Sequence, residues 1–212
     1  MRRSAGWLAL ILLGLGVALL AAGGRIYAKA VLAQLLLHRA WARTQATGAP
    51  SKPWPWADTW PVARLAAPRQ GIDLIVLAGV SGRTLAFGPG HLPGSAPPGE
   101  PGNTVLSGHR DTQFRFLKDV VPGDEIRLMT PDGRDRRYVV TGTRVVREDD
   151  TSVLDDDGWP RLTLVTCFPF DAVVPGGPLR YVVEAAGLES PRSLRWGSSA
   201  RRWAATSAGT SP

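Results

Sequence analysis

Residues 161–167 read RLTLVTC, and residues 103–109 read NTVLSGH. Both stretches are rich in β-branched and aliphatic residues, so each one predicts a β-strand. The first strand is expected to end at Cys167, because the Phe-Pro pair that follows interrupts it. The second strand leads into a polar turn that begins at His109. Two side chains with reactive potential are therefore expected at strand ends, where a site can open.

Short β-type runs of the same kind recur from Val62 onward, separated by turn signals that contain Gly or Pro. The predicted strands are Val62–Ala66, Ile72–Ala78, Thr84–Phe87, Thr104–Ser107, Glu125–Met129, Arg137–Thr141, Arg144–Arg147, Leu162–Thr166 and Leu179–Ala185. Many short strands at this spacing favour a closed barrel or a sandwich. Residues 113–119 are compatible with a short helix. The Pro/Gly-rich residues 88–102 predict a long loop, of the kind that is usually functional.

The N-terminal segment is apolar enough to enter a membrane. Residues 4–24 hold no charged side chain, and as a helix they would span about 31 Å, close to the thickness of a bilayer core. Two arginines precede them, as in a secretory leader. The preferred interpretation is an uncleaved anchor over residues 1–24, because the apolar run is long for a leader; a cleaved signal peptide is the alternative. The short leading tail favours export of the body, although basic residues after the apolar run oppose the usual charge rule.

Composition divides the rest of the chain into three parts. Residues 25–61 are expected to form a juxtamembrane helix and a linker rich in Pro and Trp, residues 62–188 a β-rich body, and residues 189–212 a disordered basic tail. The net charge of +7 comes from the two flanks, since residues 46–188 hold 15 basic and 17 acidic side chains. A body without a basic stripe argues against nucleic-acid binding, and basic flanks beside an apolar segment fit an anionic membrane surface.

Three side chains form a set that suits acyl transfer. The chain has a single cysteine, which excludes an internal disulfide framework and a cysteine-cluster zinc site. Cys167 can act as a nucleophile, His109 can carry protons to and from an amine, and Arg180, at the start of the last predicted strand, can stabilise a developing oxyanion. One barrel rim could gather all three strand ends. The structural alternative is a buried, inert cysteine.

Several motifs resemble those of the sortase family of cysteine transpeptidases. TLVTC at residues 163–167 is similar to the Thr-Leu-X-Thr-Cys signature, and NTVLSGHR at residues 103–110 to the strand that ends in the catalytic histidine. LRY at residues 179–181 is similar to the strand that carries the catalytic arginine. The resemblance extends over about Val62–Ala186. It implies a mainly β fold: a closed eight-stranded barrel of the sortase type with short helices, preceded by the N-terminal transmembrane helix.

The same resemblance implies a site and a reaction. Cys167 would attack the carbonyl of a C-terminal sorting motif in a partner protein and form a thioacyl enzyme. His109 would act first as an acid and then as a base for an amine acceptor, which the sequence does not identify. Arg180 would hold the substrate carbonyl, and Thr166 would shape the substrate groove. No cofactor and no metal is expected.

Three further segments resemble the sortases of Gram-negative bacteria, which typically serve one dedicated partner protein. These segments are GPGH at residues 88–91, GHRDTQF at residues 108–114 and TCFPFDA at residues 166–172. This narrower resemblance implies a single-pass protein of the inner membrane whose catalytic domain, residues 62–188, faces the periplasm. The acceptor is the least determined part, since a Gram-negative cell lacks the thick wall to which other sortases attach proteins.

Alternatives remain open at several positions. His91, in the long loop, is a rival for the base, although the family context favours His109. Asp111 could orient His109, or it could be a solvated turn carboxylate. The acidic runs at residues 148–150 and 155–157 invite a calcium interpretation. They lack the spacing of an EF-hand loop, so solvated acidic loops are preferred.

Other protein classes fit this sequence less well. L,D-transpeptidases place their cysteine in a Ser-X-Gly-Cys context, which differs from the Leu-Val-Thr-Cys found here. Papain-like proteases usually have their cysteine before their histidine, the reverse of the order in this chain. The non-enzymatic alternative is a membrane-tethered β-barrel that binds or scaffolds a partner and keeps Cys167 as a structural residue.

Overall fold

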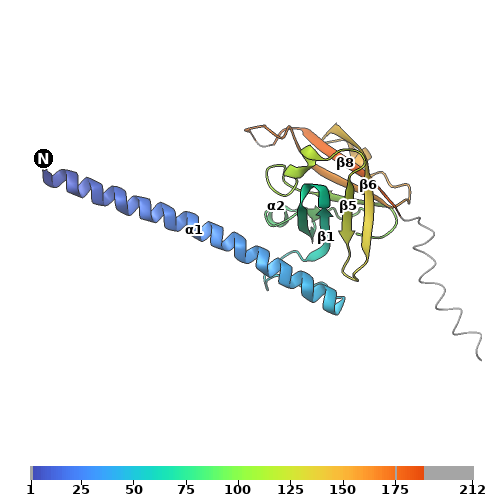
Figure 1. Ribbon diagram of the computed structural model, residues 1–212, viewed down its shortest axis with the longest axis horizontal. Coiled ribbons are helices and arrows are strands. Elements are labelled where there is room, and N and C mark those ends of the chain that lie inside the picture. The colour runs from blue at the N-terminus through green and yellow to red at the C-terminus, as the bar shows by residue number, and fades with distance from the viewer. Residues whose placement is uncertain (1, 175, 189–212) are drawn as a thin grey trace, which may run out of the picture.

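The computed structural model describes residues 2–174 and 176–188, and it shows a long helix joined to a closed β-barrel (Figure 1). The barrel strands are β1 (Pro61–Ala67), β2 (Ile72–Ala78), β3 (Gly90–His91), β4 (Asn103–Ser107), β5 (Glu125–Met129), β6 (Asp135–Arg147), β7 (Arg161–Phe168) and β8 (Leu179–Gly187). They close in the order β1-β2-β3-β4-β7-β8-β6-β5. The predicted eight-stranded closed barrel is therefore confirmed.

The barrel is mixed because β3 runs parallel to β2 and β4 runs parallel to β7, while the other neighbours are antiparallel. Its interior follows from the two-residue period of a strand. In β1 every second residue is buried, which places Ala63, Leu65 and Ala67 in the core. Phe114 and Tyr138 belong to the same core and are its largest fully buried side chains. Burial of this apolar set is the main stabilising term of the domain.

Three of the predicted strands differ from the structure. Residues 84–87 do not form a strand, because the short helix α2 (Gly82–Leu85) begins there. Its start is capped by Ser81, whose hydroxyl accepts a hydrogen bond from the Thr84 N–H. The predicted strands at residues 137–141 and 144–147 are one strand, β6, whose register against β8 shifts between Val140 and Gly142. That shift is a bulge, which the sequence presents as an interruption.

The long Pro/Gly stretch holds the two-residue strand β3, which the sequence did not predict. β3 joins β2 to β4 and so closes this part of the barrel wall. The chain passes so close to β2 here that a Cβ atom on Gly90 would lie 2.1 Å from the carbonyl oxygen of Gly79. Glycine is therefore required at position 90. The remaining short helices are 3₁₀ turns: η1 (Pro68–Gln70), η2 (Arg115–Asp119) and η3 (Thr151–Leu154).

The N-terminal helix α1 (Arg2–Thr47) is continuous, so the predicted anchor helix and juxtamembrane helix form one element. Its 46 residues span about 69 Å. It is long and apolar enough to cross a membrane, as an anchor or a leader would be. Its C-terminal part lies against the barrel (Figure 1). There Leu37 and Trp41 pack with Ile75 and Leu77 of β2. The predicted basic tail, residues 189–212, lies outside the described residues.

We expect Leu37→Ala in the full-length chain to lower the free energy of unfolding by about 2–4 kcal/mol, because this side chain of α1 is fully buried against β2. Leu35→Ala is the matched control, since that side chain is 56% exposed on the same helix. Denaturant unfolding in a mild detergent, followed by near-ultraviolet circular dichroism, measures both. Equal effects of the two substitutions would contradict the packing of α1 on the barrel.

Candidate active site

The strands β4, β7 and β8 are neighbours in the barrel, and their ends bring the predicted site residues to one rim. Ser107 of β4 pairs with Val165 of β7 in parallel register, and the Gly108 N–H donates a hydrogen bond of 3.2 Å to the Val165 carbonyl. On the other side of β7, Cys167 is the cross-strand partner of Arg180 in β8. The histidine turn, the cysteine and the arginine are thus consecutive along the rim.

Cys167 lies on the outer face of the barrel. Leu162 and Leu164 of the same strand belong to the core, so the two-residue period places Thr163, Val165 and Cys167 on the opposite face. The Cys167 side chain is only partly buried, and its thiol is free. A structural cysteine is usually fully buried, and this one is accessible from outside the barrel.

The histidine turn is held close to the cysteine strand. His109 itself is exposed, and its backbone carbonyl accepts hydrogen bonds from the Thr112 and Phe114 N–H groups. A Cβ atom on the preceding Gly108 would lie 2.8 Å from the Phe114 ring. The glycine therefore lets the turn pass over a core aromatic side chain. The hydrogen bond from the Gly108 N–H to the Val165 carbonyl places the start of this turn beside β7.

Thr166 ties the two strand ends together from the side that faces the core. Its side chain is 2% exposed, and its hydroxyl donates a hydrogen bond of 2.7 Å to the Gly108 carbonyl. The structure therefore shows Thr166 as a buried link between β7 and the histidine turn. Its predicted part in the substrate groove stays a prediction.

Arg180 is held by three acceptors at the rim. Its guanidinium donates to the Gly177 and Leu179 carbonyls at 2.7 and 2.9 Å, and it forms an ion pair of 2.7 Å with Glu148. The pair links β8 to the connection between β6 and β7. The sequence did not single out Glu148 as a partner, because it lies in an acidic run that is typical of a solvated loop.

Arg110 is the site residue that sequence reasoning missed. Its side chain is 5% exposed, and its two terminal nitrogens donate to the Pro169 and Ala172 carbonyls, both at 2.8 Å. These carbonyls belong to the β7–β8 loop, which begins directly after the cysteine strand. Asp111 is exposed, and its carboxylate lies 3.4 Å from the Arg110 Nε. The position of Arg110 beside His109 was the only signal in the sequence.

Aromatic and polar side chains shape the surroundings of the rim. Phe168, Phe170 and Tyr181 contact one another, with ring centroids 5.1–6.2 Å apart. A cavity of about 380 Å³ lies between the histidine turn, η2 and the β7–β8 loop. It is lined by Arg110, Asp111, Arg115, Lys118, Phe170 and Asp171. The cavity therefore borders the histidine turn through Arg110 and Asp111, while His109 and Cys167 are not among its lining residues.

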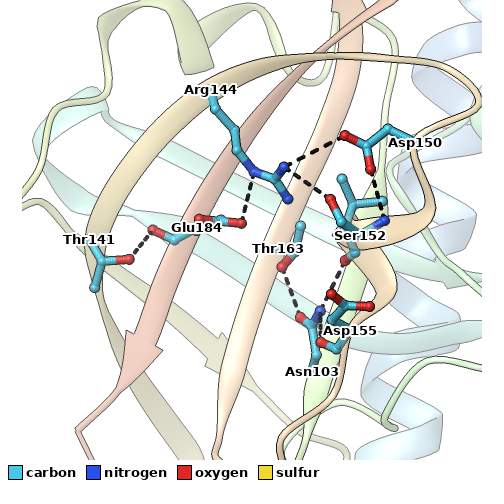
Figure 2. Close-up of polar contacts among 9 residues, drawn as sticks. Asn103, Thr141, Arg144, Asp150, Ser152, Asp155, Thr163 and Glu184 are labelled. Carbon is cyan, nitrogen blue, oxygen red and sulfur yellow. Dashed lines mark hydrogen bonds and ion pairs between the residues drawn. The ribbon is translucent and has the colours of Figure 1, made fainter.

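A polar network holds the β6–β7 connection over the same outer face (Figure 2). Asn103 accepts a hydrogen bond of 2.8 Å from Thr163, and its amide donates to two backbone carbonyls of that connection. Arg144 of β6 donates to Ser152 of η3 and to Glu184 of β8, each at 3.1 Å (Figure 2). The sequence could not predict this network, because its members come from five separate segments. The connection is thereby fixed as a wall beside β4, β7 and β8.

His91, the rival for the base, is held within its own loop. Its Nε2 lies 3.0 Å from the Ala96 carbonyl and 3.1 Å from the Ser95 hydroxyl. Because a carbonyl only accepts hydrogen bonds, the Nε2 atom carries a proton. Burial lowers the pKa of His91, although the hydrogen bond to Ala96 opposes this shift. Its contacts support a structural role in the loop.

The acidic runs carry ion pairs with arginines. Besides Glu148, Asp149 pairs with Arg147 at 3.1 Å, and Asp157 pairs with Arg161 at 2.5 Å. Within residues 2–174 and 176–188, no three His, Cys, Asp or Glu side chains converge in a way that could hold a metal ion. These acidic side chains therefore form ion pairs at the protein surface, and one of them, Glu148, holds the guanidinium of Arg180.

The fold is a closed mixed β-barrel that carries a partly exposed cysteine at its rim, and comparison with known proteins identifies the family. The sortase domain model matches residues 65–187. The chain belongs to the sortase family. It is 37% identical over 120 residues to Sortase D of Bacillus subtilis, a match that covers 56% of this chain and 60% of that protein. It is 32% identical over 110 residues to Sortase A of Listeria monocytogenes, covering 50% of this chain and 49% of that protein.

Solved structures agree with this assignment. Sortase A of Corynebacterium diphtheriae superimposes with a TM-score of 0.57 and 32% identity, and the match covers 63% of each chain. A Clostridium perfringens Sortase D5 transpeptidase shares the fold, with a TM-score of 0.61 over 75% of this chain and 99% of that one, at 22% identity. The chain spans about half to three-fifths of the length of the curated relatives it matches.

We expect His91 to make folding stability more dependent on pH. The lowered pKa keeps the folded side chain neutral, whereas His91 of the unfolded chain takes up a proton as the pH falls through about 6.5. The stability that His91 contributes is therefore present above this pH and lost below it. The fall in Tm between pH 7.5 and pH 5.5 should be smaller in His91→Gln than in the unaltered chain. The same fall in both chains would show that the buried imidazole is not linked to folding.

Proposed function

We propose that this chain is a membrane-anchored sortase that cleaves a C-terminal sorting motif of a partner protein through a thioacyl intermediate and transfers the acyl group to an amine. One observation carries the proposal: the pairing of β4 with β7 and of β7 with β8 gathers the histidine turn, Cys167 and Arg180 at one rim of a sortase barrel. The partly exposed thiol supports chemistry over the alternative of a binding module with a structural cysteine.

The first half of the reaction forms the acyl enzyme. The Cys167 sulfur attacks the carbonyl carbon of the scissile peptide, and the electron pair of the C=O bond moves to the oxygen. Arg180 stabilises that oxyanion through its fixed N–H donors. When the carbonyl re-forms, the C–N bond breaks, and the leaving amine takes a proton from His109. The products are a thioester on Cys167 and the released C-terminal segment.

The second half transfers the acyl group. An acceptor amine attacks the thioester carbon, and His109 takes the proton that the nitrogen gives up. The C–S bond then breaks with its electron pair returning to sulfur, a new amide forms, and the Cys167–His109 pair regains the proton that His109 gave up in the first half. The cavity beside the histidine turn supports entry of the acceptor from this side, since the base must reach the incoming nitrogen.

The surroundings of Arg180 support its proposed role. Glu148 and two backbone carbonyls hold the guanidinium of Arg180, which is the cross-strand partner of Cys167. A substrate carbonyl that reaches Arg180 would share or replace one of these contacts. Thr166 would act on the groove through the histidine turn, because its hydroxyl is already bound to Gly108.

The finer assignments are also proposals. α1 would be a single-pass anchor in the inner membrane, with the catalytic domain of residues 62–188 exported to the periplasm. Three sequence segments support membership of the Gram-negative class: residues 88–91, 108–114 and 166–172. The substrate would be the sorting signal of one dedicated partner protein. The acceptor is an amine of unidentified origin.

Intact mass spectrometry tests this proposal. The full-length chain in detergent is incubated with a pool of peptides that carry Leu-Pro-X-Thr-Gly-like and related motifs, because a fragment that begins after α1 would lose the packing of Leu37 and Trp41. We expect an adduct equal to the peptide minus its leaving segment. Cys167→Ala should abolish it, and His109→Gln should reduce the rate of its formation about 10²–10⁴-fold.

His91→Gln is the matched control for the histidine, and we expect it to form the adduct at the unaltered rate. Loss of the adduct in His91→Gln but not in His109→Gln would reverse the assignment of the base. A folded chain that forms no adduct and whose thiol resists small alkylating reagents would favour the binding module instead.

A further inference from the structure

We propose that Arg110 is a positioning residue that holds the histidine turn against the loop following Cys167 and so sets the geometry of the Cys167–His109 pair. This inference rests on the proposed function, because it names a group on which that pair depends. Arg110 would not touch the substrate. It would act through the two loops that it joins.

The contacts of Arg110 connect the two halves of the site. Along the chain, Arg110 directly follows His109, and Pro169 lies two residues after Cys167. Nη1 donates to the Pro169 carbonyl and Nη2 to the Ala172 carbonyl, both at 2.8 Å, so one planar group spans the start of the β7–β8 loop. These segments are 59 and 62 residues apart in sequence.

The burial of Arg110 indicates that these hydrogen bonds are required. The side chain is 5% exposed, and a buried guanidinium is costly unless its donors are satisfied. Two carbonyls and the nearby Asp111 carboxylate, 3.4 Å from Nε, supply acceptors on several sides of the group. The loop carbonyls in turn gain a charged donor. Movement of the loop away from the turn would break both sets of contacts together.

A second link completes the arrangement from the opposite side. Thr166, just before Cys167, donates to the Gly108 carbonyl, just before His109. Arg110, just after His109, donates to carbonyls just after Cys167. The two reactive residues thus lie between one hydrogen bond from Thr166 and two from Arg110. Displacement of about 1 Å at either contact is enough to reduce catalysis about 100-fold in a site of this kind.

Lysine cannot reproduce the contacts of Arg110. The guanidinium is a rigid fork whose separate nitrogens reach two carbonyls at once, whereas an ammonium group is a single point on a flexible stem. Arg110→Lys therefore keeps the positive charge but loses the double contact. Arg110→Met removes the charge and both contacts while keeping an unbranched side chain.

The test measures how fast iodoacetamide alkylates Cys167 as a function of pH, in the full-length chain in detergent. This readout needs no sorting motif. We expect the alkylation profile of Arg110→Met to match that of His109→Gln, because the imidazole no longer lies beside the thiol. Arg110→Lys should give an intermediate profile. With a peptide that forms the adduct, kcat should fall about 10–100-fold in Arg110→Met while KM changes less than threefold.

Arg69→Met is the matched control for loss of stability. Arg69 also holds a backbone carbonyl, that of Asp119 at 2.5 Å, and it pairs with the buried Asp124 at 2.7 Å, away from the site. We expect Arg69→Met to lower Tm but to keep the alkylation profile of the unaltered chain. If Arg110→Met does not fold, Arg110→Lys decides, and a profile identical to that of the unaltered chain would overturn the role of Arg110.

The outcomes separate this inference from the proposed function. A profile that depends on His109 but persists in Arg110→Met would overturn the positioning role alone. Identical profiles for the unaltered chain and His109→Gln would mean that no Cys167–His109 pair exists, and they would overturn both proposals.

Discussion

The parallel pairing of β4 with β7 is the contact on which the candidate site depends. It places the strand that leads to His109 beside the strand that ends at Cys167. Parallel neighbours need a long connection, and here the chain between them forms η2, β5, β6 and η3 before it returns. Once the two strands are paired, the Gly108 amide and carbonyl are both taken up by β7, through Val165 and Thr166. The position of the candidate site therefore follows from the strand order that closes the barrel.

Arginine side chains then hold the loops that surround this pair of strands in place. Arg110 joins the histidine turn to the β7–β8 loop, and Arg180 joins β8 to the β6–β7 connection through Glu148. Arg144 holds the same connection from β6 through Ser152 (Figure 2). Arg110 and Arg180 thereby bridge segments that are far apart in sequence, which suits the several fixed donors of a planar guanidinium. The rim is thus rigid through polar contacts, while the barrel below it is held by apolar packing.

α1 couples the barrel to the proposed membrane anchor. The helix is continuous, and its buried residues Leu37 and Trp41 lock its C-terminal part onto β2. The sequence predicted an apolar helix that ends at Gly24 and a separate juxtamembrane helix after it, because the charge-free run stops there; it did not predict that the two form one helix. A Cβ atom at position 23 or 24 would have no neighbour within 4 Å, so close packing does not require glycine at either position. A helix docked in this way would restrain the barrel relative to the bilayer.

The amino-acid sequence by itself determined most strands, the cysteine and histidine at strand ends, and the family to which the chain belongs. Those features are local: a two-residue apolar period, turn residues and short motifs act over a few neighbouring positions. It did not determine that residues 84–87 are helical, because a cap at Ser81 outweighs β-propensity there. The roles of Arg110 and Thr166 were decided only by tertiary structure. Their partners lie 58 to 62 residues away, and hydrogen bonds over such separations exist only once the barrel has closed.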